Sequence, residues 1–145
     1  MKLELQRIGI IGLGLIGGSL AAAVKSRRNS IKISAYDTDQ TALRRGLGDN
    51  LIDVACDSVQ EVADNSDLIV LAVPVNSAKA NLIQLADFKG IITDVGSVKA
   101  PLLASAREVF GDLAQVVPGH PIAGSEKHGV EAADANLFTD HKIIL

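Results

Sequence analysis

"IGIIGLGLIGGS" (residues 8–19) joins a short apolar run to a cluster of glycines. Gly12, Gly14 and Gly17 have the spacing G-x-G-x-x-G, which follows the first strand of many dinucleotide-binding units. In such a unit the first glycine permits a tight turn, the second lets the backbone approach a pyrophosphate, and the third lets the next helix pack closely on the sheet. The stretch therefore predicts a strand, a phosphate-binding turn and a helix.

The same glycines also imitate a nucleotide-triphosphate loop, because a hydroxyl residue, Ser19, follows them. That loop requires a lysine directly before the hydroxyl residue, to reach the β- and γ-phosphates, and this position is occupied by Gly18. A dinucleotide needs no lysine, since the amide groups that open the helix, including those of Leu15 and Ile16, hold a pyrophosphate without a cation. The sequence therefore favours a dinucleotide.

The composition indicates a single globular domain. A chain of 145 residues with 48% hydrophobic residues can bury one ordinary core and is too short for two full domains. Its 14 basic and 17 acidic residues are interspersed, so no strip is built to neutralise a phosphate backbone, and nucleic acid is not an expected partner. The single cysteine, Cys56, excludes an intramolecular disulfide, and no Cys/His spacing resembles a metal site. We expect a cytoplasmic protein without a metal.

Residues 8–24 carry no charge, and this stretch could be taken for a secretory signal. Five glycines within it make a poor continuous apolar helix, and Glu4 stands where a signal would be purely basic. No other run approaches the ~20 apolar residues that a membrane span requires. Neither a signal peptide nor a membrane partner is predicted.

Short apolar runs alternate with helix-patterned segments along the whole chain. Several runs are β-branched without polar alternation, which is typical of strands covered on both faces. Helical crossovers between them would make such strands parallel. The sequence predicts an α/β fold, a Rossmann-type, doubly wound, mostly parallel sheet. The predicted strands are 7–12, 31–36, 51–55, 67–73, 90–95, 114–118 and 142–145, and the predicted helical stripes are 16–24, 41–47, 78–85 and 102–109, the last with Pro101 in its first turn.

An acidic residue ends the second predicted strand. Asp37 lies 20 residues after Gly17 (37 − 17 = 20), where a carboxylate accepts hydrogen bonds from both hydroxyls of an adenosine ribose and repels a 2′-phosphate. Asp37 therefore predicts NAD rather than NADP. The competing interpretation makes it a turn residue or a helix N-cap, but Asp39 is the better candidate for the cap.

Two later strands end at the same carboxyl edge, where open α/β sheets bind ligands. Val73 and Pro74 close the strand in "VLAVPV" (70–75), and we expect them to border the cofactor. Ser97 follows the strand in "TDVGSVK" (93–99). It could cap the following helix, and one hydroxyl can cap a helix and still face a site.

His120 follows the next apolar run and is held between Gly119 and Pro121. A histidine beside a nicotinamide can take the proton of a substrate hydroxyl while a hydride leaves. The position of His120 alone does not decide between a catalytic and a structural role, since a lone histidine is more often structural. His128 and His141 lack this setting and are expected to be solvated.

Five motifs in this order resemble the nucleotide-binding domain of prephenate and arogenate dehydrogenases, enzymes of tyrosine biosynthesis. They are "GLGLIGGSLA", "YDTD", "LAVPV", "TDVGSVK" and "GHPIAGSEKHGVEAA", and the last is the most specific. The resemblance runs from about residue 7 to the end of the chain. It implies an NAD-dependent oxidoreductase that converts prephenate to 4-hydroxyphenylpyruvate by oxidative decarboxylation.

The resemblance also implies roles for individual residues. His120 would accept the substrate hydroxyl proton, and Ser97 would hydrogen-bond that hydroxyl or orient His120. Gly124, Ser125 and Glu126 would lie at the substrate, with Glu126 at the entrance, although a solvated loop carboxylate is an equally good interpretation of Glu126.

Family members continue into a helical domain that makes a homodimer and supplies an arginine for a substrate carboxylate. This chain stops at Leu145 inside an apolar run, so we expect residues 1–145 to be the NAD-binding domain without that helical domain, able to bind NAD with little or no turnover. Arogenate is a second possible substrate. The motifs also leave open a two-domain dehydrogenase of the 3-hydroxyacid type, with Lys99 as the nearby lysine, and an NAD-sensing module without chemistry.

Overall fold

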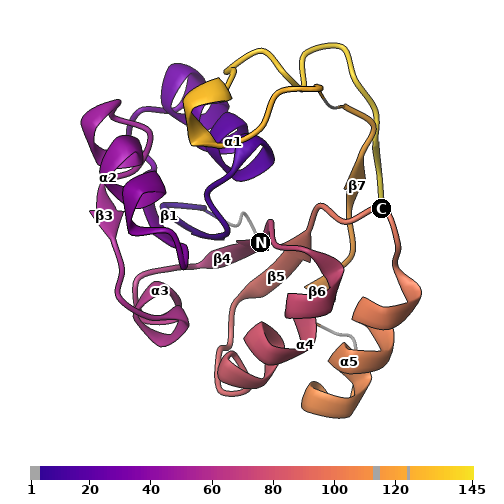
Figure 1. Ribbon diagram of the computed structural model, residues 1–145. Coiled ribbons are helices and arrows are strands. Elements are labelled where there is room, and N and C mark those ends of the chain that lie inside the picture. Colours follow the sequence, from indigo (N-terminus) through magenta and orange to yellow (C-terminus); the bar gives the residue numbers. More distant parts are fainter. Residues whose placement is uncertain (1–3, 113–114, 124) are drawn as a thin grey trace.

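Six strands form one parallel sheet, as the apolar runs predict (Figure 1). The computed structural model describes residues 4–112, 115–123 and 125–145, so Ala114 of the predicted run 114–118 lies outside the described residues. The strand order is β3-β2-β1-β4-β5-β6, and it reverses between β1 and β4, which confirms the doubly wound Rossmann-type topology. The strands are β1 (Arg7–Ile11), β2 (Lys32–Tyr36), β3 (Val54–Ala55), β4 (Leu68–Leu71), β5 (Ile91–Asp94) and β6 (Val116–Val117).

Helices cover both faces of this sheet, which explains why its strands lack polar alternation. Ile10 and Ile11 are neighbours in β1 and point to opposite faces, yet both are buried, at 0% and 1% exposure. Ile10 packs with residues of α1 and α2, whereas Ile11 packs with residues of α3, α4 and α5. The helices are α1 (Leu15–Arg27), α2 (Gln40–Gly48), α3 (Val59–Asp64), α4 (Val75–Gln84) and α5 (Ala100–Phe110).

The N-terminal residues of the helices can be compared with the caps expected from the sequence. Asp39 caps α2 by accepting a hydrogen bond from the Thr41 amide at 2.9 Å, as predicted. Helix α3 is not among the predicted helices, although the Ser58 hydroxyl accepts the Glu61 amide at its start and the Glu61 carboxylate accepts the Asp57 amide.

Ser97 does not cap α5, although capping is one of the two interpretations that the sequence leaves open. The cap position of α5 is Lys99, without a side-chain cap bond, while Pro101 lies in the first turn as expected. Ser97 stays exposed in the loop between β5 and α5, because that loop is folded around the Asp94 carboxylate, which accepts the Gly96 amide at 3.1 Å.

The last apolar run does not join the parallel sheet, and this corrects the expectation for 142–145. β8 (Ile143–Ile144) pairs antiparallel with β7 (His120–Pro121) in a separate two-stranded ribbon, and both of its residues are exposed. Between the two strands the chain holds only loops and one 3₁₀ turn, η1 (Val130–Ala132), rather than a crossover helix, among the residues that the structure describes. Without that crossover the returning strand runs in the opposite direction.

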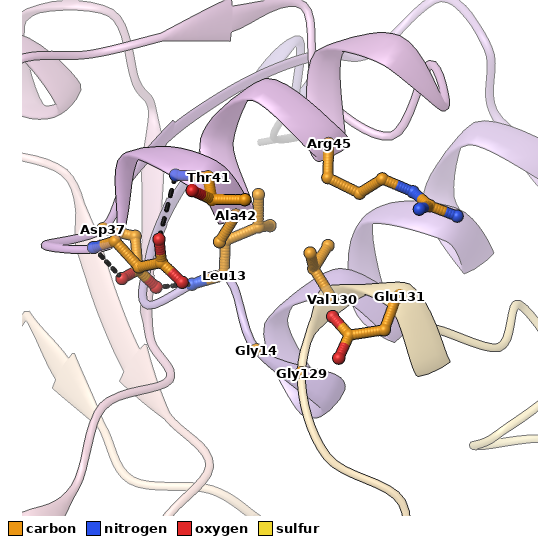
Figure 2. A pocket seen from close by; sticks show the side chains of 10 residues that line it. Leu13, Gly14, Asp37, Thr41, Ala42, Arg45, Gly129, Val130 and Glu131 are labelled. Atoms are coloured by element: carbon orange, nitrogen blue, oxygen red, sulfur yellow. Dashed lines mark hydrogen bonds between the residues drawn. The ribbon is translucent and has the colours of Figure 1, made fainter.

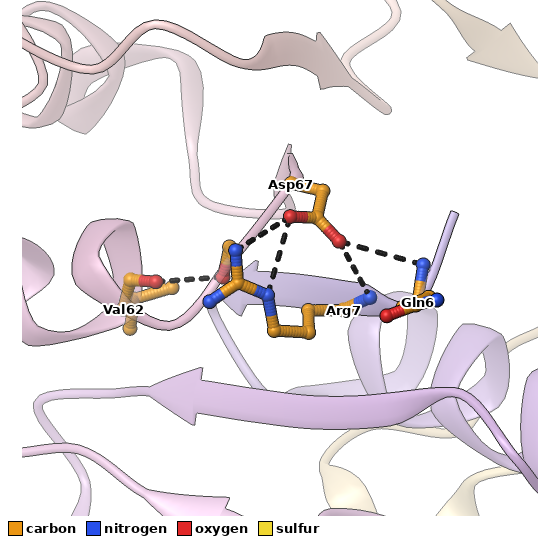
Figure 3. Close-up of polar contacts among 5 residues, drawn as sticks. Gln6, Arg7, Val62 and Asp67 are labelled. Carbon is orange, nitrogen blue, oxygen red and sulfur yellow. Dashed lines mark hydrogen bonds and ion pairs between the residues drawn. The ribbon is translucent and has the colours of Figure 1, made fainter. Parts of the chain in front are cut away.

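The amino edge of the sheet is tied together by one carboxylate. Asp67 accepts hydrogen bonds from the Arg7 guanidinium, at 2.6 Å to Oδ1, and from the Gln6 and Arg7 amides (Figure 3). The hydrogen bond from the Arg7 guanidinium is the main reason why the pKa of Asp67 is lowered. This ion pair joins the starts of β1 and β4, so its role is structural, at the end of the sheet away from the glycine turn. No helix among the described residues has the length and apolar character to cross a membrane.

Candidate functional site

The glycine turn is built by close backbone contacts at the point where the sheet order reverses. Gly12 has φ +99°, and a Cβ on it would lie less than 3.0 Å from the carbonyl oxygen of Ala72. A Cβ on Gly17 would lie equally close to the carbonyl oxygen of Gly12. Gly12 therefore makes the tight turn off β1, and Gly17 lets α1 pack against that turn, as the spacing predicts.

Gly14 differs from both of these glycines because its missing side chain faces open space. A Cβ on Gly14 would meet no atom within 4 Å. Gly14 is also the N-cap of α1 and makes no side-chain cap bond, so the amide groups of the first turn, which includes the half-buried Leu15 and Ile16, have no side-chain acceptor at the cap. Unfilled space beside free helix-start amides is the arrangement that binds a phosphate group.

Asp37 is fixed against this turn. Its Oδ2 accepts the Leu13 amide at 2.7 Å and its Oδ1 accepts the Asp39 amide at 2.8 Å. These two bonds orient the carboxylate, and each oxygen keeps a lone pair for a further donor. The predicted acidic residue is therefore held in one position beside the predicted phosphate site.

Two clefts meet at Gly14 and Asp37, which line both. One cleft of about 550 Å³ continues toward α2 and η1, and the other, of about 390 Å³, continues toward Val73 and Pro74 at the start of α4. An elongated ligand could lie across both, with its centre at Gly14. The larger cleft is lined by Leu13, Gly14, Asp37, Asp39, Thr41, Ala42, Arg45, Gly129, Val130 and Glu131, most of them shown in Figure 2.

The far side of the larger cleft contains residues that the sequence patterns do not predict. Figure 2 shows Asp37 on one side and Arg45 and Glu131 on the other. Arg45 is paired with Asp49 at 2.5 Å one helical turn later, so a nearby carboxylate already occupies its guanidinium. The spacing i,i+4 of this pair is visible in the sequence, but the approach of Glu131, 86 residues after Arg45 (131 − 45 = 86), is not.

The C-terminal segment is held on α1, and this contact explains Gly18. A Cβ on Gly18 would lie 3.1 Å from the Cβ of Ala133, and the Ser19 hydroxyl accepts the Asp134 amide at 2.9 Å. A lysine at position 18 would displace this segment. The position that excludes a triphosphate loop is thus occupied by glycine for a packing reason. Figure 1 shows this C-terminal segment beside α1.

The two candidate catalytic residues lie on neighbouring segments at the carboxyl edge. His120 is half-buried in β7, directly after β6, whereas Ser97 is exposed in the loop after β5. His120 is not among the residues that line the two clefts at Gly14. In the part of the chain that the structure describes, the His120 ring has no hydrogen-bond partner, so a ring nitrogen is available to a substrate.

The structure describes two of the three loop residues that are expected at the substrate. Ser125 and Glu126 are exposed in the loop after β7, and Gly124 lies outside the described residues. Their contact with a substrate is therefore still a prediction. His128 and His141 are exposed, as predicted.

Two further reactive side chains do not supply a competing site. The Lys99 ammonium is bonded to Asp94 and to the Gly119 carbonyl oxygen, so it is not a free catalytic amine. Cys56 is 1% exposed, and burial raises the pKa of its thiol to about 11, which keeps it protonated at neutral pH. Within the described ranges no cluster of three His, Cys, Asp or Glu side chains could hold a metal ion.

A doubly wound parallel sheet with a glycine turn at its switch point, and a carboxylate locked to that turn, defines a dinucleotide-binding domain of the dehydrogenase type. A family model described as the nucleotide-binding domain of prephenate dehydrogenase matches residues 20–145. The chain belongs to this family. The matched residues begin after the glycine turn, so they add evidence that is independent of the motif.

Relatives cover the turn as well. A cyclohexadienyl dehydrogenase of Zymomonas mobilis is 36% identical over 97% of this chain and 48% of its own length. A prephenate dehydrogenase of Lactococcus lactis is also 36% identical, over 97% of this chain and 41% of its own length. Among solved structures, prephenate dehydrogenase from A. aeolicus in complex with hydroxyphenyl propionate and NAD⁺ has a TM-score of 0.89 at 31% identity, over 99% of this chain and 51% of that one. The chain spans about half the length of these relatives.

Proposed function

We propose that this chain is the NAD-binding domain of an enzyme that oxidatively decarboxylates prephenate to 4-hydroxyphenylpyruvate in tyrosine biosynthesis. The observation that carries the proposal is the placement of Gly14 and Asp37 where two clefts meet, in a chain of this family. The structure of the A. aeolicus relative with NAD⁺ supports the choice of cofactor.

The cofactor would lie across the two clefts. Its pyrophosphate would bind at the start of α1, where Gly14 leaves space and the amides of Leu15 and Ile16 are donors. Asp37 would accept hydrogen bonds from the adenosine ribose, and Val73 and Pro74 would border the half that carries the nicotinamide. When bound, NAD⁺ supplies the hydride acceptor.

His120 would then perform the acid–base part of the reaction. It accepts the proton of the substrate hydroxyl while the hydride leaves the ring carbon that bears this hydroxyl, and loss of CO₂ makes the ring aromatic. The overall reaction releases no net proton, so the proton returns to the phenol oxygen of the product. Ser97 would hydrogen-bond the hydroxyl or orient His120, and Ser125, Glu126 and Gly124 would border the substrate.

The remaining substrate contacts would come from outside this chain. Prephenate carries two carboxylates, which one neutral histidine does not anchor, and a bidentate arginine is the usual solution. We propose that a helical domain supplies this arginine and forms a homodimer in the cytoplasm. Arogenate is the second candidate substrate, since the groups that would distinguish it are expected in that domain.

The first prediction concerns the chain by itself. We expect the 145-residue chain to bind NAD⁺ in a calorimetric titration and to produce no appreciable NADH from prephenate, because the arginine that binds a substrate carboxylate would be supplied by the proposed helical domain. The sample for this test is defined by an intact mass of 15.1 kDa, the mass expected from the sequence. Robust steady-state turnover by this chain would contradict the proposal that a second domain supplies essential substrate contacts. Failure to bind NAD⁺ would contradict the proposed function itself.

The second prediction concerns the choice between NAD⁺ and NADP⁺. Replacing Asp37 with serine is expected to weaken NAD⁺ binding by about tenfold to a hundredfold, because a hydrogen bond to a charged acceptor contributes about 1.5–3 kcal/mol. NADP⁺ affinity should fall less or rise, because the repulsion of a 2′-phosphate is lost. Parallel titrations with both dinucleotides measure the change in preference.

A matched control distinguishes the loss of hydrogen bonds to the ribose from the loss of one negative charge in the cleft. Asp39→Asn removes one negative charge from the same cleft and keeps a good helix cap, so it should change the NAD⁺ to NADP⁺ preference much less. Equal affinity for the two dinucleotides in the unmodified chain would refute the role assigned to Asp37.

A further inference from the structure

A buried carboxylate at the end of β5 holds the segment that leads to His120. Asp94 is 8% exposed, and its Oδ1 accepts the Gly119 amide at 2.9 Å. Its Oδ2 accepts the Gly96 amide at 3.1 Å and the Lys99 ammonium. A buried carboxylate is costly unless it is paired and hydrogen-bonded, and these contacts satisfy Asp94 on both oxygens.

Lys99 holds the carbonyl side of Gly119, whose amide is bonded to Asp94. Its ammonium donates a second hydrogen bond to the Gly119 carbonyl oxygen at 2.5 Å. The Gly119 amide is therefore fixed by Asp94 and its carbonyl by Lys99. This close approach requires glycine, because a Cβ at position 119 would lie 2.9 Å from the backbone oxygen of Asp94.

The bond to the Gly119 carbonyl fixes the peptide group that carries the His120 nitrogen. On the other side of His120, Pro121 restricts its backbone to extended conformations, and pairing with Ile144 keeps it in β7. With no hydrogen bond to the ring itself among the described residues, this backbone sets the direction in which the His120 side chain leaves the main chain. Loss of the Lys99 bond would release the peptide on one side.

We propose that Asp94 and Lys99 form a positioning pair, the Asp94–Lys99 clamp, that sets the direction of the His120 side chain. The clamp also encloses the loop that carries Ser97, since Gly96 and Lys99 flank it and both are bonded to Asp94. One ion pair thereby positions both candidate catalytic residues. The importance of the clamp for catalysis rests on the proposed function, but its effect on His120 does not.

The first test uses NMR resonances of this chain, which do not depend on any reaction. Lys99→Met removes both donated bonds and keeps the aliphatic stem, so we expect the Gly119 amide and His120 imidazole resonances to shift or broaden. The exposed His128 and His141 serve as references and should stay unchanged. Lys99→Arg, which retains a cationic donor, should restore most of the native pattern.

Lys79→Met is the matched control, because it breaks a surface ion pair with Glu108, at 2.9 Å, between α4 and the C-terminal end of α5. It should leave the His120 resonances at their native positions. The wild-type chain gives a second measurement: the clamp predicts slow hydrogen exchange at the Gly119 amide. Unchanged His120 and Gly119 resonances in Lys99→Met, or fast exchange of the Gly119 amide in the wild type, would overturn the proposal.

The catalytic consequence is measured in the two-domain enzyme that the proposed function describes. Lys99→Met should lower kcat for prephenate oxidation on the order of tenfold to a hundredfold, the cost of misplacing a reacting group, with little change in KM for NAD⁺. Lys99→Arg should recover most of the rate, which general loss of packing would not explain. If His120→Asn leaves oxidation unchanged, the proposed role of His120 fails while the NMR result still decides the clamp.

Discussion

Replacing His120 with asparagine is expected to reduce prephenate oxidation by about 10²- to 10⁴-fold, the usual contribution of a positioned general base. Asparagine has a similar size and can hydrogen-bond the substrate hydroxyl, but it does not accept the proton. The loss should therefore appear in kcat. The measurement is NADH formation by the proposed two-domain enzyme, with prephenate and NAD⁺ both saturating.

NAD⁺ binding provides the internal control for this variant. His120 does not line either cleft at Gly14, so His120→Asn should bind NAD⁺ with unchanged affinity. His128→Asn and His141→Asn, both at exposed positions, should keep full activity. Undiminished oxidation by His120→Asn would remove this histidine from the mechanism.

The sequence predicts the parts of the fold that depend on local signals. Continuous β-branched runs, the glycine spacing and the distance to Asp37 are short-range patterns, and the structure confirms the strands and the turn that they predict. Helix α3 is not predicted because it has only six residues, which is too short for a helical stripe to emerge.

The C-terminal third shows where these signals fail. The run 142–145 is as apolar as a core strand, yet it pairs at an exposed ribbon, because its position depends on the path of the chain rather than on its own composition. The contact of Ala133 with Gly18 and the position of Glu131 in the larger cleft also join segments far apart in sequence. No periodicity within either segment encodes such a contact.

The same limit applies to the candidate site. Asp94 and Lys99 lie five residues apart in the motif "TDVGSVK", but only the fold brings Gly119 between them. Sequence patterns can therefore identify a histidine on a constrained loop, whereas the groups that constrain it become visible only in the structure.

Replacing Gly12 with alanine is expected to destabilise the domain strongly and to abolish NAD⁺ binding. A φ of +99° is costly for a residue with a Cβ, by about 1–3 kcal/mol, and the contact with the Ala72 carbonyl oxygen adds overpacking of about 1–3 kcal/mol. Because β1 and β4 meet at this turn, the strain separates the two strands that form the switch point. Thermal unfolding and an NAD⁺ titration measure the two effects.

Gly14→Ala tests NAD⁺ binding separately from the stability of the fold. Its Cβ would enter the open space shared by both clefts, so we expect a native unfolding temperature together with clearly weakened NAD⁺ binding. Gly48→Ala, at the exposed end of α2 with no atom near its Cβ, should change neither property for the worse. If Gly14→Ala bound NAD⁺ as tightly as the unmodified chain, the pyrophosphate would not lie at the start of α1. If Gly12→Ala were as stable as Gly48→Ala, the turn would not depend on the close approach of Gly12 to the Ala72 carbonyl oxygen.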